Sequence, residues 1–293
     1  MNISEYIRER SALTEKALDA LVPLETALPV TIHKAMRYSL FAGGKRIRPV
    51  LCFAAYEAVG STFEGIENVA ATLEMIHTYS LIHDDLPALD NDDLRRGRPT
   101  NHKVFGDAMA ILAGDSLLTL AFEILAEQDA PAEIIVRLVR ELASASGTVG
   151  GMIGGQVEDI QGEGQLPTAE LLDRIHRAKT GALLQASVRM GAIYAGANED
   201  SLNALSNYGE HVGLAFQIVD DILDVEQSSE ELGKTAGKDA AQKKITFPAV
   251  YGLDQSRQMA SDQLKLAQEA IASFGHTAEP LRAIADFIVN RKA

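Results

Sequence analysis

Residues 66–86 read IENVAATLEMIHTYSLIHDDL, and this stretch decides the fold class. Its apolar side chains recur at intervals of three and four residues, which is the period of an α-helix with a buried face. The stretch ends in Asp84 and Asp85, so the helix presents carboxylates at its end. Pro87 follows and ends or disrupts the helix, because proline has no backbone N–H to donate. The stretch therefore predicts a buried helix that carries acids to one end of the protein.

The same helical spacing runs through most of the chain. Stripes of this kind predict helices at about 3–21, 30–41, 108–127, 131–146, 169–195, 199–226, 240–252, 257–273 and 279–290. Two polar stretches, 90–101 and 227–244, are predicted to be loops. Clean two-residue alternation is hard to find, so few strands or none are expected. With no fixed-period repeat and no long linker, we predict an all-α fold with residues 1–293 as a single domain.

The composition is that of a globular protein: 46% of the 293 residues are hydrophobic and 23% are charged. The formal net charge of −14 argues against a nucleic-acid partner and against a polybasic membrane contact. The single cysteine, Cys52, cannot form an internal disulfide. Residues 1–21 carry charges throughout, unlike a signal peptide. No window approaches the roughly 18–20 uninterrupted apolar residues of a membrane span. We therefore expect a cytoplasmic protein without a membrane span.

Two clusters of aspartates predict a site for a divalent metal. The first cluster contains Asp84, Asp85 and Asp90, and the second contains Asp220, Asp221 and Asp224. With Gln217, the second cluster forms one polar stripe on an otherwise apolar helix. Like charges three and four residues apart cost a helix roughly 0.2–0.5 kcal/mol per pair, and unpaired burial costs far more. Mg²⁺ would neutralise both clusters, and a solvated helix end is the alternative for either one alone.

Positive charge is concentrated in two short segments of this acidic chain. They are Lys45-Arg46-Ile47-Arg48, which follows Gly43-Gly44, and Arg95-Arg96-Gly97-Arg98. Arginine is the preferred partner of phosphate oxygens, and lysine supplies a point charge. The chain has no GxxxxGK[ST] loop and no GxGxxG turn, which argues against a nucleotide site. The segments indicate two phosphorylated groups beside the metal, with a solvated loop as the alternative for each.

Two further segments fit a phosphate site. The loop at 232–239 contains Lys234 between glycines and has the composition of a mobile phosphate lid, or of an ordinary solvated loop. Lys179-Thr180-Gly181 interrupts the predicted helix 169–195, where glycine costs about 1 kcal/mol relative to alanine. We expect a functional kink there, and a packing requirement at Gly181 is the alternative.

These motifs together resemble the trans-isoprenyl (polyprenyl) diphosphate synthases, and most closely the bacterial farnesyl-forming members. The matching segments are 43–49 (GGKRIRP), 83–90 (HDDLPALD), 95–97 (RRG), 179–181 (KTG), 213–224 with its DDILD, and 233–235 (GKT). They run in order from about residue 30 to 250. The resemblance implies a bundle of about ten or more mostly antiparallel helices around a central cavity, assembled as a homodimer.

The resemblance also implies a reaction and a set of roles. Isopentenyl diphosphate is joined to dimethylallyl or geranyl diphosphate by Mg²⁺-assisted ionisation, giving (2E,6E)-farnesyl diphosphate and diphosphate. The metal ligands implied are Asp84, Asp85, Asp90, Asp220, Asp221 and Asp224. The allylic diphosphate is held by Arg95, Lys179 and Lys234, and the isopentenyl diphosphate by Lys45, Arg48, His77 and Arg96. Thr180 and Gln217 face the carbocation, so the catalytic set is Lys179, Thr180, Gln217, Asp84 and Asp220.

Product length is expected to depend on the turn of helix before the first acidic cluster. Ser80 lies four residues before Asp84 and leaves room for a growing tail, whereas Tyr79 is bulky enough to act as a floor. In the family, an aromatic residue at this place together with Pro87-Ala88 resembles the type that forms C15 products. We therefore predict farnesyl diphosphate as the main product, with packing of Tyr79 in the core as the alternative.

Several other functions remain open. A synthase of C10 or C20 products is the nearest alternative. A terpene cyclase would lack the site at Lys45–Arg48. A helical-bundle di-iron protein is considered because 74–77 reads Glu-x-x-His, but that architecture needs a second such motif, which is absent. A binding-only subunit is disfavoured because the matched charged positions are filled.

Overall fold

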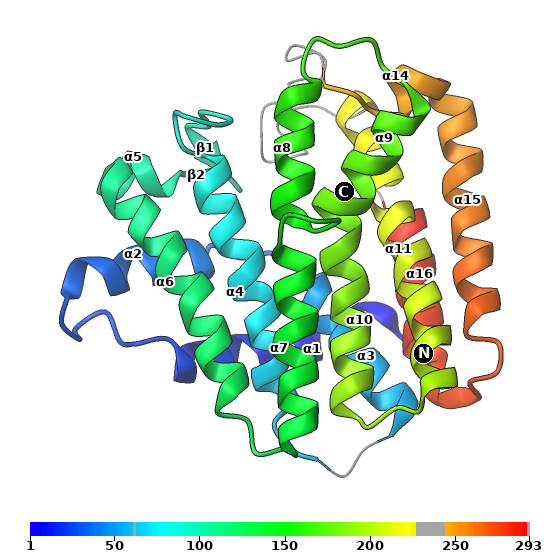
Figure 1. The fold of residues 1–293 in the computed structure, drawn as a ribbon, viewed down its shortest axis with the longest axis horizontal. Coiled ribbons are helices and arrows are strands. Elements are labelled where there is room, and N and C mark those ends of the chain that lie inside the picture. Colours follow the sequence, from blue (N-terminus) through cyan, green and yellow to red (C-terminus); the bar gives the residue numbers. More distant parts are fainter. Residues whose placement is uncertain (61–62, 227–243, 292–293) are drawn as a thin grey trace.

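A computed structural model describes residues 1–60, 63–226 and 244–291, and nearly every element in these ranges is a helix (Figure 1). The helices are α1 (Ile3–Leu21), α2 (Val30–Leu40), α3 (Ile47–Val59), α4 (Ile66–Asp84), α5 (Asn101–Phe105), α6 (Asp107–Ala126), α7 (Ala132–Ser146), α8 (Met152–Gly162), α9 (Ala169–His176), α10 (Ala182–Tyr194), α11 (Glu199–Glu226), α14 (Phe247–Tyr251), α15 (Leu253–Ala270) and α16 (Glu279–Asn290). A π turn, η1 (Arg177–Gly181), joins α9 to α10, and a 3₁₀ turn, η2 (His276–Ala278), precedes α16. Two short strands, β1 (Leu94–Arg95) and β2 (Arg98–Pro99), form an antiparallel pair. The predicted all-α fold is confirmed.

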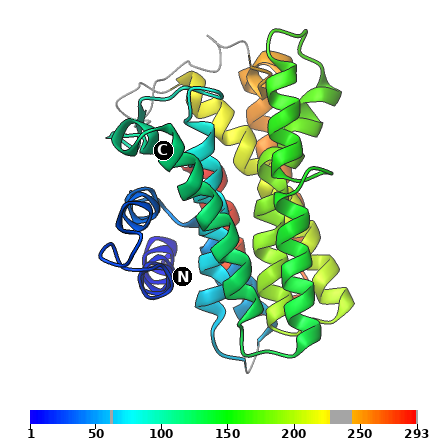
Figure 2. The same ribbon diagram turned by 60° about the vertical axis from the view of Figure 1, so that its left-hand side comes forward.

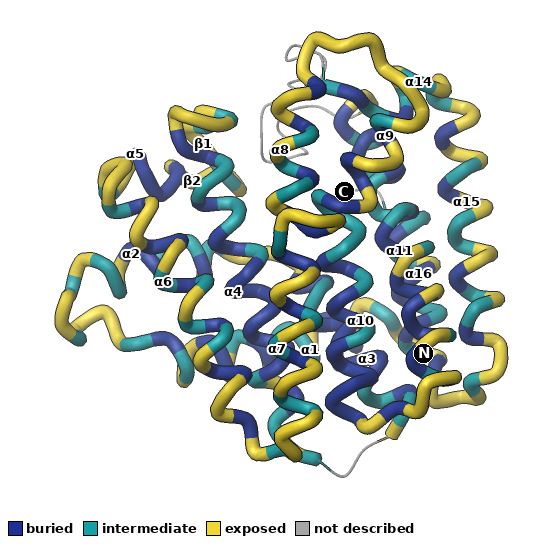
Figure 3. The backbone as a smooth tube through the Cα atoms, viewed as in Figure 1, coloured by how far each residue is buried: buried dark blue, intermediate teal, exposed yellow. Residues whose placement is uncertain are grey.

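Helices α4 and α10 lie in the middle of the bundle. Helix α4 packs against α1, α2, α3, α6 and α10, and α10 packs also against α3, α7 and α11. Figure 3 shows α4 buried along most of its length, as its apolar sequence requires. Helices α1 and α2 lie beside the bundle and cross the direction of its long helices (Figure 2). Helix α4, which ends at Asp84, is therefore surrounded by five other helices.

Most predicted helices are found within a few residues of their expected ends. Thr168 caps α9, because its hydroxyl accepts a hydrogen bond from the backbone N–H of Leu171 at 3.2 Å. Of the helix expected at 240–252, the described residues contain the short α14. Residues 227–243, which include most of the predicted loop, lie outside the described residues. Three helices, α3, α5 and α8, were not predicted. The interruption expected at 179–181 is seen as the π turn η1, which ends at Gly181.

Buried apolar side chains form two clusters. The larger one receives residues from α1 through α16 and fills the length of the bundle. The smaller one lies between α9, α11, α14 and α15, around Ile218, Ile222 and Phe247. The two clusters flank the end of α11 that carries the second acidic motif.

Helix α6 is long and apolar enough, by length and composition alone, to cross a membrane, with a mean hydropathy of 1.7 over its best window. The core helix of a soluble protein passes the same test, and α6 packs against α4 along one side. Its other side exposes Ile111 and Leu112, which are 45% and 51% exposed.

Candidate active site

A cavity of about 320 Å³ opens between α3, α4, α8 and η1. Its lining includes seven of the residues predicted from the sequence, namely Arg48, His77, Tyr79, Ser80, Asp84, Lys179 and Thr180. Helix α8 contributes a mostly apolar lining, through Met152, Ile153, Val157 and Ile160, together with the polar Gln156. The cavity thus combines charged groups from α3, α4 and η1 with a mostly apolar lining from α8. This arrangement suits a substrate with an anionic head and a hydrocarbon tail.

The first acidic motif lies where α4 ends. Burial raises the pKa of Asp84 to about 6; Lys179 opposes the shift, and the neighbouring carboxylate of Asp90 adds to it. Asp85 is 3% exposed and accepts hydrogen bonds from Nε and a terminal nitrogen of Arg95, the shortest at 2.6 Å. The carboxylate of Asp90 lies 3.3 Å from Nζ of Lys244. Asp84 is therefore an acid placed in an environment that favours its neutral form.

A buried acid on α8 connects two lysines of the site. Asp159 accepts a hydrogen bond from Nζ of Lys179 at 2.6 Å, and Nζ of Lys244 lies 3.7 Å from the same oxygen. Although burial by itself would raise the pKa of Asp159, the two lysines together lower it. The sequence did not single out Asp159 or Lys244. Asp159 lies on α8, and because that helix was not predicted, nothing in the sequence pointed to this acid.

The π turn determines how Lys179 and Thr180 reach the cavity. A Cβ atom on Gly155 of α8 would lie 2.2 Å from the backbone nitrogen of Lys179, so only glycine permits this contact. On the other side, a Cβ atom on Gly213 of α11 would lie 3.1 Å from Cα of Gly181. Turns of this kind occur frequently at functional sites. The turn is held between α8 and α11, which fixes the two side chains that it presents.

In the second acidic motif, Asp221 contacts two side chains and one backbone N–H group. Asp221 accepts hydrogen bonds from Nε2 of Gln217 at 2.7 Å and from the backbone N–H of Phe247 at 2.9 Å. Nε2 of His176 lies 3.5 Å from Oδ2 of the same carboxylate. Burial lowers the pKa of His176 to about 4, so this imidazole is neutral near pH 7. Gln217 was expected to face a carbocation, and in this structure its amide donates to Asp221.

The remaining acids of the second motif differ in exposure. Asp220 forms an ion pair with Arg291, which follows α16, and its carboxylate is 44% exposed. Arg291 also stacks over the ring of Phe216, with 4.1 Å between guanidinium carbon and ring centroid. Asp224 is 6% exposed. The stripe predicted on α11 is thus divided between an accessible acid and two buried ones.

Of the residues predicted to bind isopentenyl diphosphate, Arg48 and His77 line the cavity, whereas Arg96 lines a separate pocket together with Asp85 and Arg95. Burial lowers the pKa of His77 well below 6.5, and Arg48, Arg96 and Arg95 lower it further. Arg96 lies against Gly44, where a Cβ atom would come within 2.7 Å of its guanidinium carbon. Gly44 has a φ of +126°, which also favours glycine. Burial and the neighbouring Arg291 lower the pKa of Lys45, although Asp220 opposes the shift. Arg48, Arg95 and Arg96 thus lie close enough to His77 to act on its charge, whereas Lys45 interacts with Asp220 and Arg291.

The site residues fit a magnesium ion that is shared with a substrate. No three Asp, Glu, His or Cys side chains among the described residues converge closely enough to hold a metal by themselves. Mg²⁺ is commonly bound by one or two carboxylates, several waters and substrate phosphates. Asp84 offers a carboxylate of this kind, since a cation there would offset the burial that raises its pKa.

The Glu-x-x-His motif at 74–77 is used for a structural ion pair. Glu74, its first residue, is 2% exposed and pairs with Arg46 at 2.6 Å. Its carboxylate is therefore committed to an arginine, which removes the ligand that a di-iron site would need. Lys234, the remaining predicted phosphate ligand, lies outside the described residues.

Comparisons with known proteins agree with this geometry. A family model described as Polyprenyl synthetase matches residues 29–281. The chain is 48% identical to the geranylgeranyl diphosphate synthase of Cyanophora paradoxa over 293 residues, covering 99% of this chain and 97% of that protein. It is 50% identical to the heterodimeric geranylgeranyl pyrophosphate synthase large subunit 1, chloroplastic, of Arabidopsis thaliana, covering 98% and 79%. The crystal structure of an FPP/GFPP synthase from Zymomonas mobilis matches with a TM-score of 0.87 at 37% identity, covering 98% of this chain and 99% of that one.

Proposed function

The chain belongs to the polyprenyl synthetase family and is a prenyltransferase, and from this premise we propose that it condenses isopentenyl diphosphate with an allylic diphosphate. The observation that carries the proposal is the cavity itself. Seven residues predicted from separate sequence motifs line one space, to which α8 adds a mostly apolar lining. A diphosphate bound by the charged groups would direct its hydrocarbon tail along that lining.

The reaction has three bond changes. The allylic C–O bond breaks, and its electron pair leaves with the diphosphate. The double bond of isopentenyl diphosphate then attacks the allylic cation, and a proton leaves the adduct for the departing diphosphate. Charge therefore develops on the leaving group, where cationic side chains stabilise the transition state more than the ground state. The apolar wall of α8 excludes water, which would otherwise capture the cation.

The two acidic motifs are proposed to hold Mg²⁺. Bound Mg²⁺ would supply charge stabilisation to the departing diphosphate. Asp84 and Asp90 would hold it on one side, and Asp220 and Asp224 on the other. Asp85 and Asp221 complete the set, and their contacts with Arg95 and Gln217 fix the orientation of the two motifs.

The cations divide between the two substrates. We assign the allylic diphosphate to Arg95, Lys179 and Lys234, and the structure adds Lys244, because its Nζ contacts the carboxylates of Asp90 and Asp159. We assign the isopentenyl diphosphate to Lys45, Arg48, His77 and Arg96. Thr180 and Gln217 would place oxygen dipoles near the carbocation without offering a strong nucleophile.

For the product, C20 geranylgeranyl diphosphate is better supported than the C15 product predicted from the sequence. Two relatives that are 48% and 50% identical are named geranylgeranyl synthases. Tyr79 is buried, but its hydroxyl has no hydrogen-bond partner among the described residues, so packing alone holds the ring. Its ring meets that of His83 edge to face, with centroids 5.8 Å apart. A ring held only by packing can yield to a longer tail.

Farnesyl diphosphate remains the second candidate because of the same tyrosine. Tyr79 lines the cavity beside Asp84, at the place where a bulky ring would stop a short tail. The structural neighbour from Zymomonas mobilis is described as an FPP/GFPP synthase, which spans products on both sides of C20.

One incubation tests both proposals. The enzyme would receive labelled isopentenyl diphosphate, Mg²⁺ and, in separate reactions, dimethylallyl, geranyl or farnesyl diphosphate, followed by chromatography of the dephosphorylated alcohols. A C20 alcohol from all three starters is expected. Accumulation of C15 with no use of farnesyl diphosphate would replace the first candidate by the second, and no elongation at all would overturn the condensation.

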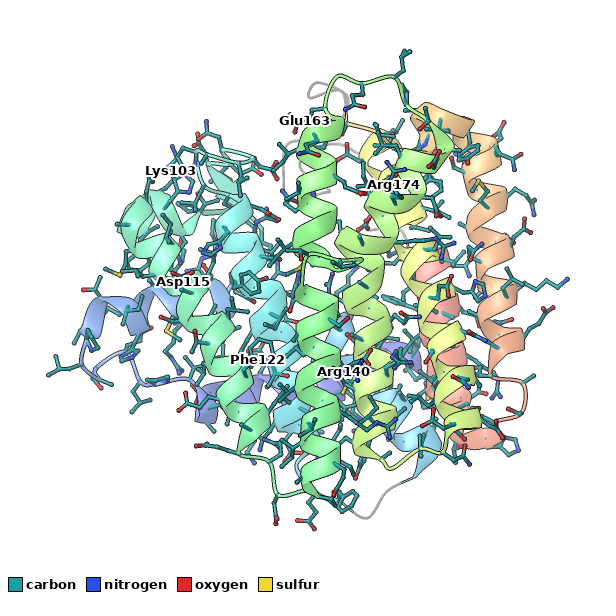
Figure 4. All side chains as sticks on the ribbon, viewed as in Figure 1. Lys103, Asp115, Phe122, Arg140, Glu163 and Arg174 are labelled. Atoms are coloured by element: carbon teal, nitrogen blue, oxygen red, sulfur yellow. The ribbon has the colours of Figure 1, made fainter. Side chains whose placement is uncertain are left out.

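The assembly and the domain organisation are proposed on separate grounds. A single domain over residues 1–293 is supported by one core cluster that contains residues from α1 to α16. A homodimer is supported by the apolar outer side of α6, where Ile111 and Leu112 are exposed. Asp115 and Phe122, labelled in Figure 4, lie farther along the same helix. A cytoplasmic location stays a prediction, and one relative is named as chloroplastic.

A further inference from the structure

Arg46 lies between two proposed diphosphate ligands but does not share their surroundings. It precedes α3, with Lys45 before it and Arg48 two residues after it. Its φ is +49°, in the left-handed region that non-glycine residues seldom adopt. Arg46 is 3% exposed, whereas Lys45 is exposed and Arg48 lines the cavity. The turn therefore directs Arg46 into the protein interior, while Lys45 stays exposed and Arg48 reaches the cavity.

The guanidinium of Arg46 is bound by groups from three other helices. Nε donates to Glu15 of α1 at 2.8 Å, and one terminal nitrogen donates to Glu74 of α4 at 2.6 Å. The other terminal nitrogen donates to the backbone carbonyl of Leu40 at the end of α2, also at 2.6 Å. All three guanidinium nitrogens are thus used. Fixed forks of this kind are specific to arginine, because lysine offers only one nitrogen.

Glu74 also acts on the cations of the site. Burial lowers the pKa of Arg48 and of Arg96, and in both cases Glu74 opposes the shift. Glu74 lies on α4 three residues before His77, and one turn of helix separates them. The pair of Arg46 and Glu74 therefore connects the turn carrying Lys45 and Arg48 to the helix carrying His77.

We propose that Arg46 is a positioning residue for the diphosphate of isopentenyl diphosphate, held by Glu15, Glu74 and the carbonyl of Leu40 so that Lys45 and Arg48 keep their places beside His77. The proposal rests on the proposed function, since it assumes that these three residues bind that substrate. A purely structural role would lower stability and affect both substrates alike. A positioning role affects chiefly one substrate, because Arg95 and Lys179, which are assigned to the allylic diphosphate, lie on β1 and η1 and not on the turn before α3.

The test measures both KM values and kcat for the whole enzyme. Arg46→Gln is expected to raise the KM for isopentenyl diphosphate about tenfold or more, with the KM for the allylic substrate changed less than about twofold. Arg46→Lys keeps the charge without the fork and should restore only part of this loss. Glu15→Gln is the milder variant, because its carboxylate is partly exposed; it is expected to raise the same KM about threefold.

The matched control is Arg189→Gln. Arg189 makes a two-point contact with Glu141, at 2.6 and 3.0 Å, and joins α10 to α7 away from the cavity. Its loss should lower the Tm and leave both KM values unchanged.

The outcomes distinguish a failure of the proposed function from a failure of the positioning role. A wild-type enzyme that forms no prenyl product overturns the proposed function and this inference with it. An active wild type in which Arg46→Gln raises both KM values equally, or neither, overturns the inference alone. If Arg46→Gln does not fold, Glu15→Gln decides: a selective rise in the KM for isopentenyl diphosphate supports the positioning role, and unchanged values overturn it.

Discussion

Asp84 combines burial with a position at the end of α4, and this combination makes it the acid on which activity should depend most. We expect Asp84→Ala, and separately Asp220→Ala, to lower kcat/KM by on the order of 10³-fold or more, because each removes a proposed metal ligand and its transition-state stabilisation. Steady-state kinetics at saturating Mg²⁺ would measure the loss. Circular dichroism would show that the variants fold, and near-normal activity in a folded Asp84→Ala protein would remove the metal assignment.

The raised pKa of Asp84 leads to a second prediction, which concerns stability without metal. The pKa is about 6 in the folded protein, against an ordinary value of 3.8 for this side chain, so the folded state binds the proton more tightly than the unfolded chain. This acid therefore lowers stability progressively as the pH rises from about 4 to about 6. In EDTA near pH 7, Asp84→Asn should have a Tm equal to or above that of the wild type, and the difference should vanish near pH 4. A clearly lower Tm near pH 7 would contradict the direction of the shift.

Separate binding sites for the two diphosphates give a third prediction. Lys45→Ala or Arg96→Ala should chiefly raise the KM for isopentenyl diphosphate, whereas Lys179→Ala should chiefly lower kcat. The leaving group gains charge in the transition state, while the diphosphate of the acceptor does not. Initial rates with one substrate varied at a time distinguish the two effects. If Lys45→Ala altered only the KM of the allylic substrate, the division of the cations would be wrong.

At the scale of the element, α4 is proposed to provide both the metal end of the site and the path of the growing tail. One turn of helix rises about 5.4 Å, close to the length of an isoprene unit. Tyr79→Ala should therefore shift the products to chains at least one unit longer, and Ser80→Phe should shorten them. Chromatography of the dephosphorylated alcohols gives the distribution. Ser80→Ala is the control, and an unchanged distribution in a folded Tyr79→Ala enzyme would remove Tyr79 from the path.

Two helices that were not predicted, α3 and α8, show what hydrophobic periodicity cannot detect. Helix α3 is buried on nearly all sides, so its apolar residues form no single stripe. Helix α8 contains Gly154 and Gly155, which weaken a helix by about 1 kcal/mol each relative to alanine. Both glycines are explained by close approach: a Cβ on Gly154 would lie 1.9 Å from the carbonyl oxygen of Thr148. Such contacts depend on the packed structure and leave no local signal.

The site could be predicted where its residues are neighbours in sequence, and not where they meet across the fold. The motif acids and the basic segments lie within a few residues of one another, so their spacing was informative. Lys244 contacts Asp90 across 154 positions, and Arg46 contacts Glu74 across 28. No pattern in the sequence indicates that Arg46, unlike Lys45 and Arg48, turns towards two carboxylates.

For the whole molecule, the exposed apolar side of α6 gives a prediction about assembly. Leu112→Lys should convert a dimer to a monomer, because a charge would replace apolar surface that association buries. Size-exclusion chromatography with light scattering measures the mass. Leu266→Lys on α15, which lies across the bundle from α6 in Figure 1, is the control and should leave the mass unchanged. A monomeric wild type, or a Leu112→Lys protein of dimer mass, would contradict this interface.

The side chains of Lys45, Arg48, His77 and Arg96 have a consequence for the kinetics of a working enzyme. These groups are proposed to bind a diphosphate, and every turnover of the proposed reaction releases one as a by-product. The liberated anion carries the same head as the incoming acceptor and competes for the same side chains. The rate is then expected to fall as by-product accumulates, unless another enzyme hydrolyses it. Sustained synthesis would thus depend on a second enzyme that hydrolyses the released diphosphate.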